Sequence, residues 1–344
     1  MSETGFTVFI GGSAGAIEAL AELLGRLPEE LAAPVLVVVH VGRAGASVLP
    51  SILDRVGALH AITPADGEEL VDGIVYVAPR GEHMLVEGSC VRLSAGPAEH
   101  GLRPAIDPLF RSAARECGPR AIGVVLSGML DDGTAGLREV QARGGWTLVQ
   151  APDEATFRSM PESAIAGVAV DYVLPVAQIA ERIEMLVRSG VLRTDAGGDS
   201  PQSWKPEPFV GDLGGREPPG MRTDITCPEC GGVLWEQVQE RITIYRCRAG
   251  HLYSLESLLA VQGEGLDSAI WRPIRMLHER GALLRRLAER AASHGRTRSA
   301  DYFNAEAEDA LRRAAELRRA LTDSERHEEP VDLKELHRIG AERP

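Results

Sequence analysis

Residues 7–15 read TVFIGGSAG, a short apolar strand that runs directly into a glycine-rich turn. An amphipathic segment, Ala16–Leu27, follows the turn and is closed by Pro28. The next strand, Pro34–His40, is nearly all valine, as expected of a strand that is covered on both faces. This strand–helix–strand order predicts a parallel sheet with helices packed on its two sides.

The same alternation of strands and helices continues as far as residue 190. Further core strands are expected at Ile74–Ala78, Ile122–Ser127 and Trp146–Gln150, and shorter ones at Met84–Val86, Val91–Leu93 and Val173–Leu174. Helices are expected at Ser47–Val56, Pro104–Cys117, Thr134–Arg143, Pro161–Ala166 and Val176–Arg188. The predicted fold class is α/β, with a doubly wound, mostly parallel sheet.

Length and composition limit the classes of protein to be considered. With 344 residues, the chain is expected to hold more than one domain. A formal net charge of −13 argues against nonspecific binding to nucleic acid or to an anionic membrane. The longest apolar runs, such as Val35–Val39, are too short for a membrane span, and no signal-peptide pattern opens the chain. We therefore expect a cytoplasmic protein without membrane insertion.

The sequence changes character after the α/β part. Periodicity is lost between Thr194 and Gly220, a stretch rich in glycine and proline, which is typical of a linker. Two amphipathic segments near the C-terminus, Ala269–Ala292 and Ser299–Leu321, predict a helical hairpin with a regulatory or self-associating role. The expected organisation is an α/β domain at 1–190, a linker at 191–220, a cysteine-containing module at 221–259, the hairpin at 260–325 and a charged tail at 326–344.

The glycine-rich turn carries the candidate nucleophile. Gly11–Gly15 fits the G-x-S-x-G pattern between a strand and a helix, with Ser13 at its centre. Small neighbours permit a sharp turn that exposes the serine hydroxyl, and the start of the following helix offers N–H groups, that of Ala14 included, to a developing oxyanion. A phosphate-binding loop is the competing interpretation, but neither G-x-G-x-x-G nor G-x-x-x-x-G-K-[ST] fits these residues.

A histidine and an aspartate follow other core strands. His40 ends the valine-rich strand, and Asp132 comes shortly after Ile122–Ser127 in an Asp-Gly turn. Taken singly, each has an ordinary explanation. His40 could be a hydrogen-bonded core histidine or a surface histidine, and Asp132 could simply belong to a common type of turn. Because the carboxyl ends of parallel strands share one edge of a sheet, we expect Ser13, His40 and Asp132 to meet there as nucleophile, general base and orienting acid. Their order along the chain differs from the serine, acid, histidine order of the α/β-hydrolases.

The segment Phe6–Arg188 resembles the catalytic domain of the chemotaxis protein-glutamate methylesterases, the CheB family. The stretches that carry the resemblance are IGGSAG at 10–15, VVVH at 37–40, YVAP at 76–79 with His83, RPAIDPLF at 103–110, LSGM at 126–129 with Asp132-Gly133, Met160-Pro161 and Ala164-Ile165. They cover over half of the chain in the family's order.

The resemblance implies hydrolysis of glutamyl methyl esters on methyl-accepting receptors or similar methylated signalling proteins, together with deamidation of receptor glutamines. It assigns catalysis to Ser13, His40 and Asp132, with no cofactor required. Met129 matches a position beside the site and is expected to contact the oxyanion or the substrate. His83 and Arg103 are expected to shape the substrate groove, although Arg103 could equally pair with a carboxylate at the edge of the core.

Two departures from the family pattern bear on regulation. Family members that act in chemotaxis carry an N-terminal receiver domain, and here the first catalytic strand already begins at residue 7, which leaves no room for one. Leu130 occupies a loop position often filled by glycine, so we expect an altered site mouth. Control by phosphorylation of the usual kind is therefore not expected.

The C-terminal half contains a cluster of metal-ligand residues. Cys227 and Cys230 form a CxxC knuckle, and Cys247 and His251 form a CxxxH pair. Three thiolates and one imidazole make a closed tetrahedral site, typical of structural zinc, and Val233–Tyr245 between them is typical of a zinc-ribbon hairpin. The alternatives are an unmetallated redox pair at Cys227 and Cys230, or a fourth ligand other than His251.

Three functions compete on this sequence. The first is a serine carboxyl-ester hydrolase acting on methylated receptors. The second is a non-catalytic signalling adaptor that keeps the methylesterase fold, although such an adaptor would not need Ser13, His40 and Asp132 together. The third is a nucleotide-binding regulator, which the missing phosphate-loop pattern disfavours.

Overall fold

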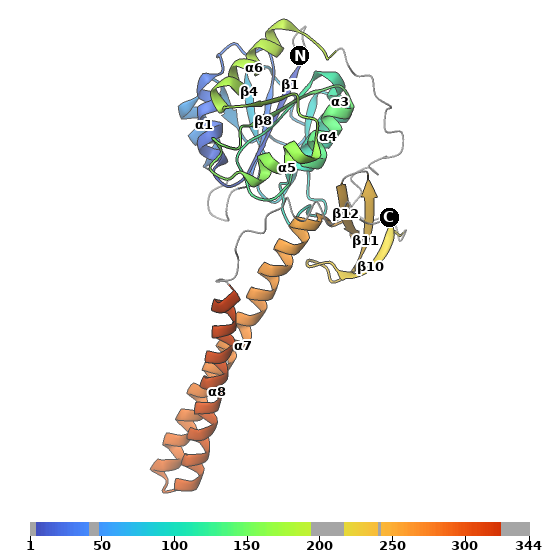
Figure 1. The fold of residues 1–344 in the computed structure, drawn as a ribbon. Coiled ribbons are helices and arrows are strands. Elements are labelled where there is room, and N and C mark those ends of the chain that lie inside the picture. The colour runs from blue at the N-terminus through green and yellow to red at the C-terminus, as the bar shows by residue number, and fades with distance from the viewer. Residues whose placement is uncertain (1–4, 41–47, 194–216, 240–241, 325–344) are drawn as a thin grey trace. The chain divides into compact units, whose positions relative to one another are not determined.

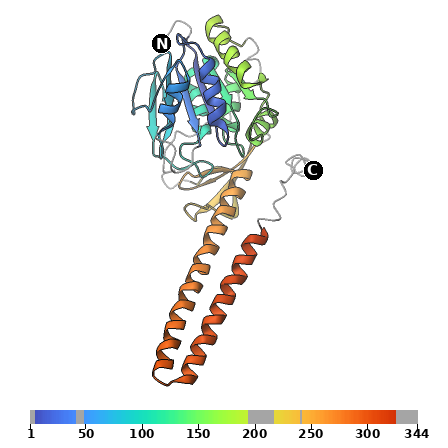
Figure 2. The ribbon, with the colours of Figure 1, turned by 90° about the vertical axis from the view of Figure 1, so that its left-hand side faces the viewer.

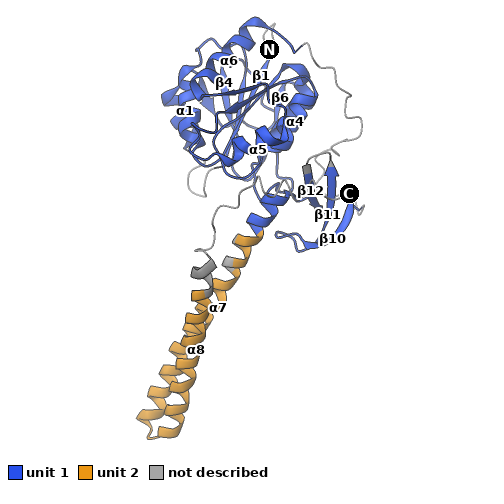
Figure 3. Cartoon of the chain, viewed as in Figure 1, with its two compact units in different colours: residues 1–261 blue, residues 262–344 orange. Residues whose placement is uncertain are grey.

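A computed structural model of the chain describes residues 5–40, 48–193, 217–239 and 242–324. The chain divides into two compact units, residues 1–261 and 262–344 (Figure 3). Most of the expected linker, the start of the expected helix at Ser47 and the whole expected tail at 326–344 lie outside the described residues.

The first unit is built on a seven-stranded sheet in the order β3-β4-β2-β1-β7-β8-β9, and every neighbouring pair is parallel (Figure 1). The strands are β1 (Thr7–Gly12), β2 (Val35–Val39), β3 (His60–Ile62), β4 (Ile74–Val77), β7 (Ala121–Val125), β8 (Trp146–Gln150) and β9 (Tyr172–Leu174). The predicted fold class is thereby confirmed. Strand β3 was missed, because a three-residue edge strand with a partly exposed pattern gives no periodic signal.

Helices cover both faces of this sheet. One face packs on α1 (Ala16–Arg26), α2 (Leu49–Val56) and α6 (Val176–Ser189), and the other on α3 (Ile106–Cys117), α4 (Thr134–Ala142) and α5 (Ser159–Gly167). A 3-10 turn, η1 (Gly118–Arg120), follows α3. An antiparallel hairpin of β5 (His83–Glu87) and β6 (Cys90–Ser94) packs against α3 through β5. Within β1, Val8 and Ile10 belong to one core and Phe9 to the other, so the strand is buried on both sides.

The order in which successive strands are added to the sheet changes direction between β1 and β7. Strand β1 continues through α1 to β2 on one side, whereas β7 continues through α4 to β8 on the other. In open parallel sheets, such a switch point leaves a crevice at the carboxyl ends of the two strands. The segments that leave β1 and β7 carry Ser13 and Asp132, so the fold places both beside this crevice.

Residues 221–239 and 242–254 of the first unit form a separate four-stranded antiparallel sheet, here called the ribbon sheet. Its strands are β10 (Met221–Thr226), β11 (Val233–Gln239), β12 (Ile242–Cys247) and β13 (Leu252–Ser254). Its small core contains Leu234, Tyr253 and Leu258 beside two of the cysteines.

Two long helices follow, α7 (Leu255–Ser293) and α8 (Thr297–Ser324), and they lie side by side (Figure 2). Helix α7 begins at Leu255 rather than at the expected Ala269, because glycines at 263 and 265 weakened the helical signal there. Alanines 307, 310 and 314 are buried, and Gly281 packs against Leu311, so small residues allow the helices to approach closely. No helix among the described residues is both long enough and apolar enough to cross a membrane.

Candidate active site

Ser13 lies in the tight turn that joins β1 to α1. The strand ends at Gly12 and the helix begins at Ala16, and Ser13 is partly exposed between them. Gly15 has a φ of 69°, and a Cβ atom there would lie 2.7 Å from the Thr156 Cβ. Only glycine fits both the left-handed backbone and this close contact, so the turn can present the serine hydroxyl at the crevice.

Ser127, the second residue after β7, holds this turn in place. The Ser13 N–H donates to the Ser127 carbonyl at 3.0 Å, and the Ser127 hydroxyl donates to the Ala14 carbonyl at 2.8 Å. The Ser127 N–H in turn donates to Oε1 of Gln150 on β8 at 2.7 Å. Ser127 therefore ties the turn that carries Ser13 to β7 and β8. The sequence analysis did not find this role, because residues 126–127 look like an ordinary strand end.

His40 stands beside Ser13 on the neighbouring strand. The β1–β2 pairing matches Gly12 with Val39, and the His40 N–H donates to the Gly12 carbonyl at 3.1 Å. Its Nε2 atom lies 3.0 Å from Oδ2 of Asp132, although the ring N–H is not aligned for a hydrogen bond. The two side chains are therefore close enough to form an ion pair when the imidazole is protonated. In this orientation, Nδ1 is the nitrogen left to face a substrate or nucleophile.

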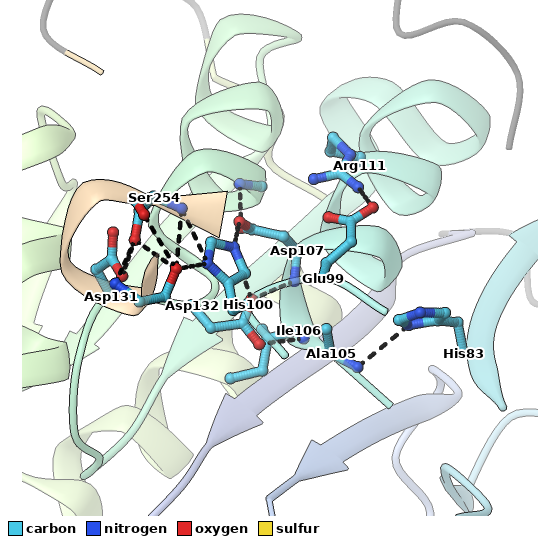
Figure 4. A network of polar contacts seen from close by, with 12 residues as sticks. His83, Glu99, His100, Ala105, Ile106, Asp107, Arg111, Asp131, Asp132 and Ser254 are labelled. Atoms are coloured by element: carbon cyan, nitrogen blue, oxygen red, sulfur yellow. Dashed lines mark hydrogen bonds and ion pairs between the residues drawn. The ribbon is translucent and has the colours of Figure 1, made fainter. Parts of the chain in front are cut away.

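Asp132 is buried and is fixed by the first turn of α3 (Figure 4). Its Oδ2 accepts the Ile106 N–H at 2.7 Å, and its Oδ1 accepts the Asp107 N–H at 3.0 Å. Burial by itself would raise the pKa of this carboxyl, but the contact with His40, the charge of His100 and the Ile106 N–H hold the pKa well below its usual range. Asp132 is thus a permanent carboxylate at the start of a helix.

The N–H groups around Ser13 limit where an oxyanion can bind. Those of Ser13, Gly128 and Leu130 all donate to other protein atoms. Ala14 and Met129 stay the predicted oxyanion donors, and the Met129 side chain is exposed. Leu130 has a φ of 63°, a left-handed backbone that glycine adopts without strain, which explains why glycine suits this loop position.

His83 and Arg103 have different surroundings. His83 is fully buried, with Nε2 3.0 Å from the Pro97 carbonyl and Nδ1 accepting the Ala105 N–H at 3.2 Å. Burial is the main cause that lowers its pKa. In this structure His83 supports the start of α3, and its expected part in shaping the substrate groove stays a prediction. Arg103 is exposed and donates to the carbonyls of residues 95–96 rather than to a carboxylate, so its contact with substrate stays a prediction.

His100 and Asp107 were missed by the sequence analysis. His100 Nε2 lies 3.0 Å from Asp107 Oδ2 and 3.8 Å from Asp132 Oδ1. Burial opposes its charged form, yet the hydrogen bond to Asp107 and the charges of Asp132 and Asp107 together raise the pKa of His100 to about 10. It is therefore an imidazolium at neutral pH. Asp107 is only seven residues away, but no strand end or known motif marks His100, and its other partner, Ser257, is 157 residues away.

The four predicted metal ligands come together in the ribbon sheet. The Sγ atoms of Cys230 and Cys247 lie 3.6 Å apart, and His251 Nδ1 lies 3.6 Å from Cys227 Sγ and 3.4 Å from Cys247 Sγ. All four ligand atoms lie within 4.8 Å of one another. On the far side of the ring, His251 Nε2 lies 3.0 Å from Oε2 of Glu229, which fixes the orientation of the imidazole.

A serine hydroxyl, an imidazole and a buried carboxylate at the switch point of a parallel sheet form the arrangement of a nucleophilic acyl hydrolase. The chain belongs to the CheB methylesterase family, whose model matches residues 8–183. This family's members appear among both the similar sequences and the similar structures.

A relative from Leptospira interrogans, named for protein-glutamate methylesterase and protein-glutamine glutaminase, is 37% identical over 175 residues, which is 51% of this chain and 91% of the relative. A protein from Anaeromyxobacter dehalogenans that bears the same two names is 40% identical over 183 residues, 53% of each chain. The crystal structure of the Thermotoga maritima CheB methylesterase catalytic domain matches with a TM-score of 0.51 and 32% identity, covering 53% of this chain and 98% of that domain. These matches span about half of the present chain.

Proposed function

We propose that the protein is a protein-glutamate methylesterase that hydrolyses glutamyl methyl esters of methyl-accepting receptors or similar methylated signalling proteins. The observation that carries the proposal is the 3.0 Å contact of His40 with Asp132 on the strand next to Ser13, in a chain of the CheB methylesterase family. Relatives at 37–40% identity bear the same activity in their names.

The proposed reaction has two steps and needs no cofactor. The Ser13 hydroxyl attacks the ester carbonyl while His40 Nδ1 takes its proton, and Asp132 stabilises the imidazolium that forms. The tetrahedral intermediate collapses, His40 returns the proton to the methoxide oxygen, and methanol leaves. Water then attacks the acyl-enzyme by the same route and releases a glutamate side chain and free Ser13. A glutamine amide would follow the same path with ammonia as the leaving group.

The first test is the release of methanol from methylated receptor membranes by purified protein, beside a Ser13→Ala variant. We expect release by the wild type and its loss in the variant. Folded wild-type protein that releases no methanol from several receptors would contradict the proposal and favour the signalling adaptor instead.

We further propose that Cys227, Cys230, Cys247 and His251 hold a structural zinc ion. Zinc bond lengths of about 2.3 Å to sulfur and about 2.0–2.1 Å to nitrogen require tetrahedral S···S and S···N separations of about 3.8 and about 3.6 Å. The separations of 3.4–3.6 Å between these atoms match that geometry closely. Four protein ligands leave no open position, so the ion would stabilise the fold rather than act in catalysis. Thiolates need a reducing compartment, which supports a cytoplasmic location.

Zinc content is measured by elemental analysis of protein purified without added metal. We expect about one zinc per chain and its loss in Cys247→Ser, whereas Cys90→Ser, which changes a cysteine outside the cluster, should keep it. Retention of full zinc in Cys247→Ser would contradict this ligand set.

We also propose that the α7–α8 hairpin mediates self-association. Its exposed apolar side chains include Trp271, Met276, Leu283 and Leu287. Exposed apolar side chains on a helical hairpin are typical of an interaction surface. Sedimentation equilibrium should show a dimer or larger species that Leu283→Glu weakens, and a monomer at all concentrations would overturn the proposal.

A further inference from the structure

The ribbon sheet contacts the α/β fold at the loop of residues 98–102. The His100 N–H donates to the Leu252 carbonyl at 2.7 Å, and the Leu252 N–H donates to the Ala98 carbonyl at 3.4 Å. This segment therefore pairs with β13 as a short additional strand. A Cβ atom at Gly101, whose φ is 73°, would lie 2.8 Å from Val261 Cγ2 of α7. The loop is thus fitted closely against the ribbon sheet and the start of α7.

The same loop carries the imidazolium that faces the triad acid. His100 Nε2 points to Asp107 and Asp132, as described above (Figure 4). On the other side of the ring, His100 Nδ1 lies 2.9 Å from the Ser257 hydroxyl at the start of α7. With Nε2 directed to carboxylates, Nδ1–H is the donor and the Ser257 oxygen accepts. Ser257 thereby fixes the rotation of the ring that supports Asp132.

A second hydrogen bond runs from the same junction to the loop of the triad acid. The Ser254 hydroxyl donates to Oδ1 of Asp131 at 2.8 Å. The same hydroxyl oxygen, Ser254 Oγ, accepts the Ser257 N–H at 3.0 Å. Ser254 and Ser257 are both buried, with exposed fractions of 4% and 0%. Asp131, the neighbour of Asp132 in the chain, is therefore held by Ser254 at the end of β13.

These contacts matter because they fix the position of a buried cation between two buried carboxylates. Asp107 Oδ1 accepts the Gly136 N–H of α4 at 2.7 Å, so Asp107 and Asp132 fix the starts of two helices while both are buried. Two buried carboxylates this close repel unless a cation lies between them. His100 is that cation, and a neighbouring buried pair, Arg111 with Glu99, closes the other side of the cluster. His100 therefore helps to hold Asp132 in place, together with the N–H groups of Ile106 and Asp107.

We propose that the β13–α7 junction, residues 252–257, positions the triad acid, acting through His100 and Asp131. His100 and Ser257 are positioning residues and touch no reacting atom. The cysteine-containing module is accordingly part of the catalytic apparatus rather than an independent appendage. This inference rests on the proposed function only in taking Ser13, His40 and Asp132 as a triad, whatever ester the enzyme hydrolyses.

The test measures the rate at which p-nitrophenyl acetate acylates Ser13 in the full-length protein, with p-nitrophenolate as the leaving group. We expect Ser257→Ala to slow acylation by between about tenfold and about 100-fold, because a small misplacement of a catalytic group has effects of that size. Ser254→Ala, which cuts the bond to Asp131, should slow it in the same direction. The matched control is Ser112→Ala, an equally buried serine whose hydroxyl bonds only to backbone atoms of residues 86 and 109.

A double-mutant cycle separates positioning from general destabilisation. If Ser257 acts through Asp132, then Ser257→Ala should change the acylation rate less than about twofold in an Asp132→Asn background, since the losses are not additive along one pathway. With a methyl-ester substrate, kcat should fall while KM stays within about twofold. Melting temperatures of all variants are recorded beside the rates, and Ser254→Ala carries the test if Ser257→Ala does not fold.

The proposal is overturned if the folded serine variants acylate at the wild-type rate, if Ser112→Ala slows acylation equally, or if the effect of Ser257→Ala is undiminished beside Asp132→Asn. Failure of the proposed function has a different signature. In that case the wild type releases no methanol from methylated receptors, yet its Ser13 is still acylated and the cycle can still be read.

Discussion

Oδ2 of Asp132 lies 3.0 Å from Nε2 of His40, in a contact where the two side chains are 3% and 10% exposed. The carboxylate also accepts two backbone N–H groups from the start of α3. The acid is therefore held by a helix that begins far from its own loop. The histidine, by contrast, is held by the sheet through its backbone bond to Gly12. The geometry of the proposed triad therefore depends on how α3 packs against that sheet.

The first prediction concerns the triad acid. We expect Asp132→Asn to lower kcat by a factor of about 10⁴, since an amide cannot stabilise the imidazolium that forms on His40. KM should change little, because Asp132 does not face the substrate. Methanol release measured over a range of substrate concentrations separates the two constants. Asp66→Asn, a change at an exposed carboxylate, is the control and should behave as wild type; a comparable loss there would contradict a specific role for Asp132.

His100 should make stability depend on pH at the alkaline end. Its pKa is raised to about 10, above its ordinary value of 6.5, so the folded state gains stability from the charged ring below pH 6.5 and loses it as the pH rises through about 10. We expect His100→Asn to destabilise the protein by about 3–5 kcal/mol at pH 7, since the buried carboxylates lose their cation. Urea denaturation at pH 7 and pH 10.5 measures this. A difference between wild type and variant that is as large at pH 10.5 as at pH 7 would speak against a charged His100.

Asp131 should also make stability fall as the pH rises, but in the acid range. Burial, its main cause, raises the pKa of Asp131 from 3.8 to about 6, so the folded state holds the proton more tightly and stability falls as the pH rises from 3.8 to 6. Because Asp131 retains some exposed surface, we expect the cost at pH 7 to be about 1 kcal/mol.

The variant Asp131→Asn keeps an oxygen to accept the Ser254 hydroxyl but cannot ionise. Its stability between pH 4 and pH 6 should therefore lack the decline that Asp131 contributes to the wild type. Thermal unfolding at a series of pH values compares the two curves, and parallel curves over this range would exclude Asp131 as the titrating group.

Removal of metal is expected to unfold the ribbon sheet first. Its core is small, so metal binding should supply much of its folding free energy. A strong chelator should lower the melting temperature, and added zinc should restore it. If the inference on the β13–α7 junction is right, the acylation rate of Ser13 should fall and recover in parallel. Calorimetry with and without chelator, with Cys90→Ser beside Cys247→Ser, makes the measurement; a melting curve insensitive to the chelator would contradict a structural metal.

The sequence by itself determined the α/β fold and the edge of the sheet where the site lies. The alternation of valine-rich strands with amphipathic helices is a local pattern, and a parallel sheet brings the ends of its strands to one edge whatever the details of packing. Ser13, His40 and Asp132 could be singled out because each follows a core strand. The cysteine spacing likewise identified four residues that the structure brings within 4.8 Å.

What supports these residues was decided only by the tertiary structure. Ser127, His100 and Ser257 carry no local signature, and the full burial of His83 could not be predicted from its neighbours in the sequence. Ser254 and Asp131 are 123 positions apart, and His100 and Ser257 are 157 apart. Hydrogen bonds and charge pairs of this kind depend on distance in space, which sequence spacing does not encode. The strand ends were predictable because backbone geometry fixes them, whereas the buried network depends on how two separately patterned parts of the chain pack together.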